Sequence, residues 1–416
     1  MDNLNKYFSQ DKKGGIVWIK ENTFFGFSDI VTWAGKGKLP FEKAAGKIDL
    51  VLTGPHSSAA IPMELKPFIL ENFTQRMQFD YSDVSTDAVA QRWAEIDEHV
   101  VYIRNPHSRL VFDQNRAPVE NPEEQLRLIF KQVALKKAGQ EASFSGIDSI
   151  RPVTFADHPV LKQPKNDAEW KHLIAIITTV AKKGSLAYAS TRDKILETIF
   201  EKKCRLLHEI DLRAVNAMEL HGACCLNVQC IHDTMNAKAF PDGAVSDKKP
   251  AENCLPKIAT LSNRGDHNGE IRPDSSGGQL DHINLLTCTG HDLRTLKRAF
   301  QLSFGIQEKV LSDHLRLNFP YYGAWEVQKL GQVLKFMESH GQIAHGSGQG
   351  ILSIKTGAYQ SEFLREMLMG KINTKKIQTP GKTWPEPDTE HVDYLAQRFK
   401  KTYDILRCWN FNLAMP

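Results

Sequence analysis

Residue types that bind metal ions follow several apolar runs in this sequence. His56 comes after a run that ends at Leu52, His221 comes after a short apolar stretch at 217–220, and Asp83 stands at the start of a predicted helix. Because ligands bind outside the carboxyl ends of strands in open α/β sheets, we expect these side chains at one edge of a sheet. Two or three imidazole or carboxylate ligands with an open position for water would make a zinc hydrolase site. No short spacing connects the three residues, and a helix cap or a surface position would also explain each one alone.

A second polar group surrounds the next apolar run, with Arg109 before it and Asp113, Asn115 and Arg116 after it. A guanidinium group binds a carboxylate through two parallel hydrogen bonds, which a lysine cannot reproduce. The two arginines could therefore bind a substrate carboxylate, or they could pair with Asp113 and neighbouring carboxylates. The residue types alone leave both interpretations open.

The elements that must position these residues alternate between strands and helices. Strands are expected within 15–32 and at 48–52, 99–105, 109–116, 217–220, 313–323 and 350–355. Helices are expected at 83–97, 122–138, 167–183, 192–215, 289–305, 324–340, 359–369 and 388–407, with a long loop at 240–280. This alternation predicts a three-layer α/β/α fold with a mixed, mostly parallel sheet. We expect an N-terminal β extension (1–47), an α/β domain (48–370) and a C-terminal helical tail (371–416) packed on the same domain.

The composition narrows the classes of function. Lys and Arg number 53 against 49 Asp and Glu, and a net charge of +4 over 416 residues disfavours a dedicated nucleic-acid-binding protein. We expect neither a secretory signal, because residues 1–15 are polar, nor a membrane span, because no apolar run approaches roughly 18 to 20 residues. The odd number of cysteines, seven, indicates reduced thiols and a cytoplasmic protein. Cys224, Cys225, Cys230 and His232 match no common zinc spacing, so buried thiols are expected there.

The order of these motifs resembles the N-formylglutamate amidohydrolase family from about residue 48 to about residue 369. The segments that carry the resemblance are Pro55-His56-Ser57-Ser58 with Pro62, Asp83-x3-Asp87, Ser108-Arg109, Asp113-x-Asn115-Arg116, Glu219-x-His221, 262–266 and 318–323. The Asp-x-Asn-Arg element is the most specific of them. The resemblance implies a phosphorylase/hydrolase-like α/β fold.

The resemblance also implies a zinc-dependent amidohydrolase with one zinc ion per chain. The implied zinc ligands are His56, Asp83 and His221, supported by Glu219 and Asp87. The implied substrate-binding residues are Ser57, Arg109 and Arg116, with Asp113 and Asn115 holding the arginines. Water activated by the metal would attack the amide or formamide bond of a small N-acyl amino acid with a carboxylate, such as N-formylglutamate. Nucleic acid and membrane are not expected partners.

One departure from the family concerns the general base. The family has Gln-Ile-Glu on a late strand, whereas the nearest match here is Ser353-Ile354-Lys355. A lysine cannot accept a proton from water while it remains an ammonium ion. Either Glu362 or Glu366 on the next predicted helix is the base, or the register differs, or activity is altered or lost. The alternatives are therefore a non-catalytic binder of small carboxylates and a peptidase-like amidase on larger substrates.

Overall fold

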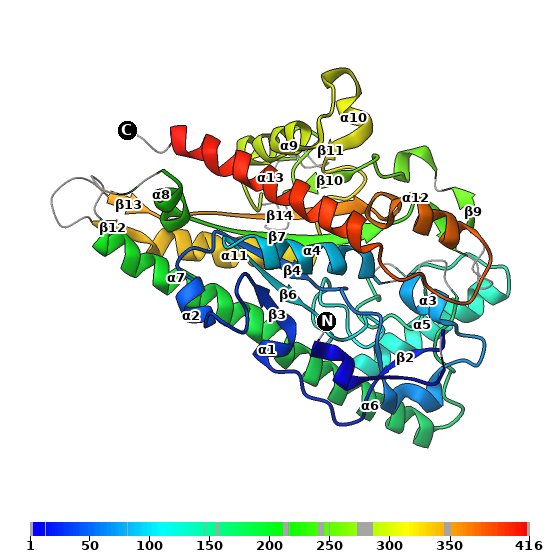
Figure 1. Cartoon of the computed structure of the whole chain (residues 1–416). Helices are drawn as coiled ribbons and strands as arrows, with labels where there is room; N and C mark the ends of the chain where they lie inside the picture. The colour runs from blue at the N-terminus through cyan, green and yellow to red at the C-terminus, as the bar shows by residue number, and fades with distance from the viewer. Residues whose placement is uncertain are drawn as a thin grey trace.

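A mixed seven-stranded sheet lies at the centre of the protein (Figure 1). The structure is a computed structural model that describes residues 3–12, 14–80, 82–144, 146–154, 158–210, 215, 217–239, 245–248, 250–272, 286–344 and 351–413. In spatial order the strands are β11 (Leu315–Leu317), β10 (Ala259–Ser262), β14 (Lys355–Leu364), β7 (Cys225–Thr234), β4 (Leu50–Gly54), β6 (Val100–Arg104) and β3 (Val31–Trp33). The pairs β14–β7, β7–β4, β4–β6 and β10–β11 are parallel, while β10–β14 and β3–β6 are antiparallel. The predicted mixed, mostly parallel sheet is thus confirmed.

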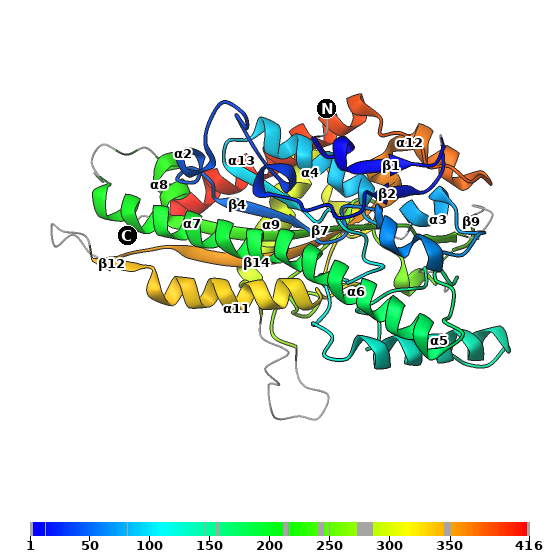
Figure 2. The ribbon, with the colours of Figure 1, turned by 90° about the horizontal axis from the view of Figure 1, so that it is seen from below.

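Helices pack on both faces of this sheet (Figures 1 and 2). One face contacts α7 (Ala189–Glu209) and α11 (Trp325–His340), and the other contacts α4 (Val84–Ile96), α9 (Gly290–Phe304) and α13 (Thr389–Leu413). Alternate residues of β4 divide between the two cores, with Val51 in the first and Leu50 and Leu52 in the second. A strand buried on both faces has a continuous apolar sequence, which is why β4 could be predicted. The three-layer α/β/α architecture is confirmed.

The N-terminal residues join both this sheet and a smaller one. Strands β1 (Phe8–Gln10) and β2 (Val17–Ile19) pair with β5 (Ile61–Pro62) in a three-stranded sheet, while β3 is the last strand of the central sheet. A third apolar core includes the buried residues of α5 (Pro122–Lys137) and α6 (Asp167–Ala187). Among the described residues, no helix has the length and apolar character to cross a membrane.

Most of the remaining elements are short, and α12 is the longest of them. The helical ones are η1 (Asn3–Tyr7), α1 (Phe27–Ile30), α2 (Phe41–Ala44), η2 (Met63–Phe68), α3 (Gln75–Asp80), α8 (Ala217–Cys224), η3 (Ala251–Asn253), η5 (Glu308–Val310), α10 (Leu311–His314) and α12 (Arg365–Gln378). The strands β8 (Ala237–Ala239) and β9 (Val245–Lys248) form one two-stranded sheet, and β12 (Gln342–Ala344) and β13 (Ile351–Ser353) form another.

Several predicted elements are wrong. Residues 109–116 form turns after β6 and not a strand, and residues 217–220 begin α8 and not a strand end. The predicted loop at 240–280 contains β9 and β10, and part of it lies outside the described residues. The predicted helix at 359–369 is mostly β14, because this segment pairs with β7 on one side and with β10 on the other. Pairing on both sides satisfies its backbone groups and overrides the local helical pattern.

Candidate metal centre

The candidate site lies at the carboxyl ends of β4, β7 and β14. His56 stands two residues after β4, and His232 lies in β7 two residues before its end. Asp83 occupies the N-cap position of α4, yet its side chain makes no capping hydrogen bond. The carboxylate of Asp83 instead contacts both imidazole rings. The predicted cap interpretation of this residue therefore does not describe its side chain.

Three ligand atoms of these residues form a small triangle. The Oδ2 atom of Asp83 lies 3.1 Å from Nδ1 of His56 and 3.1 Å from Nδ1 of His232, and the two nitrogen atoms are 3.3 Å apart. A tetrahedral zinc site with bonds of about 2.0 to 2.1 Å has ligand atoms roughly 3.3 Å apart. All three side chains are buried. The donor types and the spacing therefore fit one face of a tetrahedral zinc site, with the fourth position open.

The carboxylate of Asp113 contacts the ring nitrogen of His56 that is not a candidate ligand atom. The Nε2 atom of His56 lies 2.5 Å from Oδ1 of Asp113, and Asp113 is fully buried. Arg109 donates to the other oxygen of Asp113 from Nε (3.1 Å) and Nη2 (2.5 Å). Although burial alone would raise the pKa of Asp113, Arg109 and His56 hold it well below its usual range. A carboxylate in this position fixes the ring and makes the opposite nitrogen a better metal ligand.

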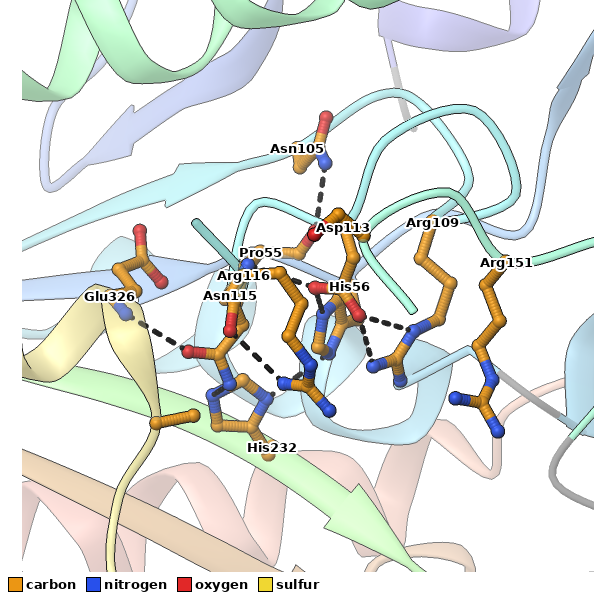
Figure 3. A network of polar contacts seen from close by, with 12 residues as sticks. Pro55, His56, Asn105, Arg109, Asp113, Asn115, Arg116, Arg151, His232 and Glu326 are labelled. Carbon is orange, nitrogen blue, oxygen red and sulfur yellow. Dashed lines mark hydrogen bonds and ion pairs between the residues drawn. The ribbon is translucent and has the colours of Figure 1, made fainter. Parts of the chain in front are cut away.

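His232 has a different neighbour, the amide of Asn115. The Nδ2 atom of Asn115 lies 3.4 Å from Nε2 of His232, and its Oδ1 atom accepts a hydrogen bond from the backbone N–H of Glu326 (3.1 Å). The backbone carbonyl of Asn115 accepts from Nη1 of Arg116 (3.0 Å). The Asn115 side chain was expected to hold the arginines, but here it contacts a candidate ligand (Figure 3).

Arg365 connects the two segments that carry Asp83 and His232. Its Nη2 atom donates to the carbonyl of Ser82 (2.9 Å), and its Nε atom donates to Oδ1 of Asp233. The other oxygen of Asp233 accepts from the backbone N–H (2.9 Å) and the hydroxyl (2.7 Å) of Thr86. The buried guanidinium of Arg365 thereby fixes Ser82, which precedes Asp83, and Asp233, which follows His232.

A cavity of about 380 Å³ opens beside the triangle, a volume typical of small-molecule sites. Its polar lining includes Arg109, Arg116, Tyr321 and Glu362. Glu362 lies on β14 directly opposite His232 of β7 in the parallel register, so both side chains point to the same face about 4.8 Å apart along the sheet. The sequence over this part of β14 is Gln360-Ser361-Glu362, which has the first and last residues of the family's Gln-Ile-Glu, whereas residues 353–355 have only the middle one.

The structure corrects two of the predicted site residues. His221 lies on α8, before β7 begins, where its Nε2 atom is 3.6 Å from Asp49 and its Nδ1 atom is 3.5 Å from Cys225. Because Cys225 and His232 are seven residues apart on one strand, His221 is roughly 23 Å from the candidate site. Lys355 is likewise exposed at the far end of β14 and cannot act in the cavity. The side chain of Glu219 lies outside the described residues.

Ser57 and Asp87 are adjacent to the site, and the side chains of both contact Tyr102. The Tyr102 hydroxyl lies 2.6 Å from the Ser57 hydroxyl and donates to Asp87 (2.7 Å). Asp87 also accepts from Arg104 (2.6 Å), while the Ser57 hydroxyl donates to the carbonyl of Gly54 (2.6 Å). These contacts fix the turn after β4, on which His56 stands.

His232 is a candidate ligand that the sequence interpretation missed. The segment before it, 225–231, is mostly apolar and is followed by His232 and Asp233, which is the same signal that identified His56. Grouping His232 with Cys224, Cys225 and Cys230 concealed this signal. The three thiols are free, and His232 extends toward His56 and Asp83.

The comparison with protein families agrees with the resemblance found in the sequence. The family model for N-formylglutamate amidohydrolase matches residues 48–177, less than a third of the chain, and confirms the resemblance to a divergent member of that family. The match indicates an amidohydrolase-like function. It includes His56, Asp83 and the 109–116 segment, while His232 and Glu362 lie beyond it. Neither the curated proteins nor the solved structures include a match to this chain.

Proposed function

We propose that this protein is a zinc-dependent amidohydrolase that cleaves the amide or formamide bond of a small N-acyl amino acid, the class to which N-formylglutamate belongs. The observation that carries the proposal is the buried triangle of His56, Asp83 and His232 at the wall of a cavity that also contains Glu362. Two imidazole nitrogens with one carboxylate oxygen are a donor set of catalytic zinc sites, which leave one position open. When bound, zinc would lower the pKa of water and polarise the amide carbonyl.

Glu362 is the proposed general base. It is largely buried, and its place opposite His232 puts a carboxylate beside the ligand atoms. A carboxylate there would accept a proton from the attacking water and deliver it to the leaving nitrogen. The hydroxyl of Tyr321 lines the same cavity, and burial, together with the negative charge of Glu362, raises the pKa of this hydroxyl. Tyr321 therefore stays protonated and would donate a hydrogen bond to the substrate.

Arg109 and Arg116 are the proposed binding residues for the substrate carboxylate. Both line the cavity, and each is held by a carboxylate, Arg109 by Asp113 and Arg116 by Asp148. A guanidinium group has five N–H donors in a fixed plane, so it can bond a protein carboxylate and a substrate carboxylate together. Such a contact would fix the substrate with its amide toward the zinc ligands.

The proposed partner is a small carboxylate-bearing molecule, with neither nucleic acid nor membrane involved. The small net charge and the small volume of the cavity support this proposal. We also propose a cytoplasmic location, which the free cysteines support. The position of Glu362 favours an enzyme over a binder that has lost its base.

Zinc stoichiometry in three proteins tests the proposal directly. The wild type and His221→Ala should each hold about one zinc ion per chain, whereas His232→Ala should hold none. The His221→Ala variant is the matched control, because it also removes a buried histidine, from the helix that precedes β7. Turnover of N-formyl and N-acetyl amino acids should be lost only in His232→Ala. Absence of zinc from the wild type after incubation with the metal would contradict the proposal.

A further inference from the structure

A second cavity, of about 210 Å³, lies between α3, α4, α12 and the segment 384–388 that precedes α13. These elements and β2 lie side by side at one end of the molecule (Figures 1 and 2). The volume is below the roughly 300 Å³ at which sites for drug-sized ligands begin, so this cavity fits only a small molecule. Its wall is mostly apolar and includes Phe79, Val84, Ala88, Leu368, Trp384 and Val392.

The charged residues of the second cavity are both acidic. Among the described residues that line it, these are Glu386 and Asp388, and neither forms an ion pair with another described residue. The Oδ1 atom of Asp388 accepts from the backbone N–H of His391 (3.2 Å) at the start of α13. A carboxylate has roughly four acceptor positions, so this single bond leaves Asp388 able to accept from a ligand as well.

We propose that the second cavity binds a small organic amine with an apolar body, and that this occupant stabilises the candidate metal centre. The apolar wall would receive the body of the molecule, and the rings of Phe79 and Trp384, 6.0 Å apart, supply aromatic surface for it. Glu386 and Asp388 would pair with the ammonium group. A ligand carboxylate would instead meet two like charges, so the cavity discriminates against anions.

The second cavity shares part of its wall with the cavity beside the metal triangle. Met369 lines the second cavity and Met235 lines the first, and both belong to one buried apolar cluster. Trp384 packs against this cluster. The Cζ atom of Arg365, which lines the first cavity, lies 5.7 Å from the centre of the Trp384 ring. The two cavities are therefore separated by side chains that contact one another.

Arg365 is the residue through which an occupant would act on the candidate metal centre. Its guanidinium lies over Trp384 and bonds Ser82 and Asp233, the neighbours of two candidate ligands. A ligand that packs on Trp384 restricts the ring and thereby the guanidinium. Such coupling is reciprocal, so the amine raises zinc affinity by the same factor by which zinc raises amine affinity. This coupling rests on the proposed function, whereas the amine site itself does not.

Calorimetric titration of the purified chain with three compounds of nearly the same size tests the amine site. Phenethylamine should bind at one site per chain, 2-phenylethanol about tenfold more weakly, and 3-phenylpropanoate not measurably, because pairing with each carboxylate contributes roughly threefold. Glu386→Gln with Asp388→Asn should remove the preference for phenethylamine, while the asparagine keeps the helix cap. Glu42→Gln with Glu390→Gln, which removes two exposed carboxylates outside the cavity, is the control and should keep the preference.

A variant that fills the cavity tests its location. Ala88→Leu should abolish the binding of both phenethylamine and 2-phenylethanol, and Val392→Phe supplies the same decision if Ala88→Leu does not fold. Equal affinity of the wild type for these two compounds overturns the inference. Absence of saturable binding overturns it as well, and so does unchanged binding in a folded variant with a filled cavity.

Zinc titration against a competing chelator tests the coupling. Saturating phenethylamine should raise the zinc affinity of the wild type about tenfold and leave that of Ala88→Leu unchanged. The Ala88→Leu variant controls for direct contact between the amine and zinc. Equal zinc affinity of the wild type with and without the amine overturns the coupling. If the wild type binds no zinc, the proposed function fails, and the calorimetric titrations still decide whether the amine site exists.

Discussion

Replacing Arg365 is expected to weaken zinc binding, although this residue is not a candidate ligand. Arg365 bonds the carbonyl of Ser82, directly before Asp83, and the carboxylate of Asp233, directly after His232. It also donates from Nη1 to the carbonyl of Asp80 (2.5 Å). Two of the three candidate ligands are therefore positioned by one guanidinium. We expect that its loss lets the ligand atoms of Asp83 and His232 move apart.

The size of the effect follows from the number of contacts that each variant keeps. Partners that orient metal ligands contribute 10-fold to 100-fold in metal affinity. Arg365→Lys keeps the charge beside Asp233 but cannot reach three separate acceptors, so we expect a loss of about tenfold. Arg365→Met leaves Asp233 buried without its cation, so we expect a loss of about 100-fold and a decrease of about 3 to 5 kcal/mol in the free energy of unfolding.

Competitive titration of zinc against a chromophoric chelator measures this affinity, at a temperature where circular dichroism shows each variant to be folded. Arg76→Met provides a matched control. Arg76 is also buried, and it donates to the carbonyls of Ile377 (2.6 Å) and Thr379 (3.0 Å), which belong to neither ligand segment. This control should lower stability without lowering zinc affinity. Wild-type zinc affinity in both Arg365 variants would refute the reasoning.

Three further predictions address the base, the core and the dependence on pH. Glu362→Gln should lower kcat by at least about 100-fold and retain zinc, whereas Lys355→Ala should change neither quantity, and equal losses in the two variants would contradict the assignment of the base. Arg407→Met should lower the free energy of unfolding, measured in urea, by about 3 to 5 kcal/mol, because Arg407 donates to both oxygens of buried Asp49 (2.8 and 2.9 Å). A smaller decrease than in an Arg→Met variant at an exposed position would contradict this prediction. Burial lowers the pKa of His107 to about 4, below the roughly 6.5 of an unfolded chain, so the unfolded state binds more protons in this interval. His107 alone should therefore lower the free energy of unfolding by about 2 kcal/mol between pH 7 and pH 5, and His107→Phe should remove that part of the slope in urea titrations at several pH values.

The sequence could predict those site residues that follow a short and wholly apolar strand. His56 stands directly after β4, and β4 is buried on both faces, so the apolar run and the turn after it are visible in the sequence. The segment 109–116 was wrongly predicted as a strand, yet it still follows β6 and enters the cavity. In both places the motif determines the position of the side chain, and the exact secondary structure matters little.

The sequence could not predict β14, because this strand is buried and yet largely polar. Polar residues in its middle find partners only in the folded protein. The Ser361 hydroxyl accepts from Gln229 (2.5 Å) of β7, and the amide oxygen of Gln360 accepts from the backbone N–H of Ala324 (2.9 Å). Such partners are distant in sequence, so no local pattern reveals that Glu362 lies on a strand next to His232.

The choice between His221 and His232 depends on the direction of a single strand. Both residues flank the same apolar segment, β7, one before it and the other near its end. In open α/β sheets, ligands bind at the carboxyl ends of the parallel strands. His221 precedes β7, so it lies at the opposite edge of the sheet.

Asp113 contacts both a candidate zinc ligand and an arginine of the cavity, and this double contact constrains how the site works. One oxygen of Asp113 contacts His56 and the other accepts from Arg109, so the carboxylate fixes a candidate ligand and a substrate-binding group at once. A substrate carboxylate that shares the guanidinium of Arg109 would weaken its bonds to Asp113 and leave Asp113 with more negative charge toward His56. More negative charge behind an imidazole strengthens the opposite nitrogen as a metal ligand. Binding of the substrate carboxylate to Arg109 would thus strengthen the binding of the metal ion by His56. The effect would pass through Asp113, which contacts both residues, and would need no movement of the backbone.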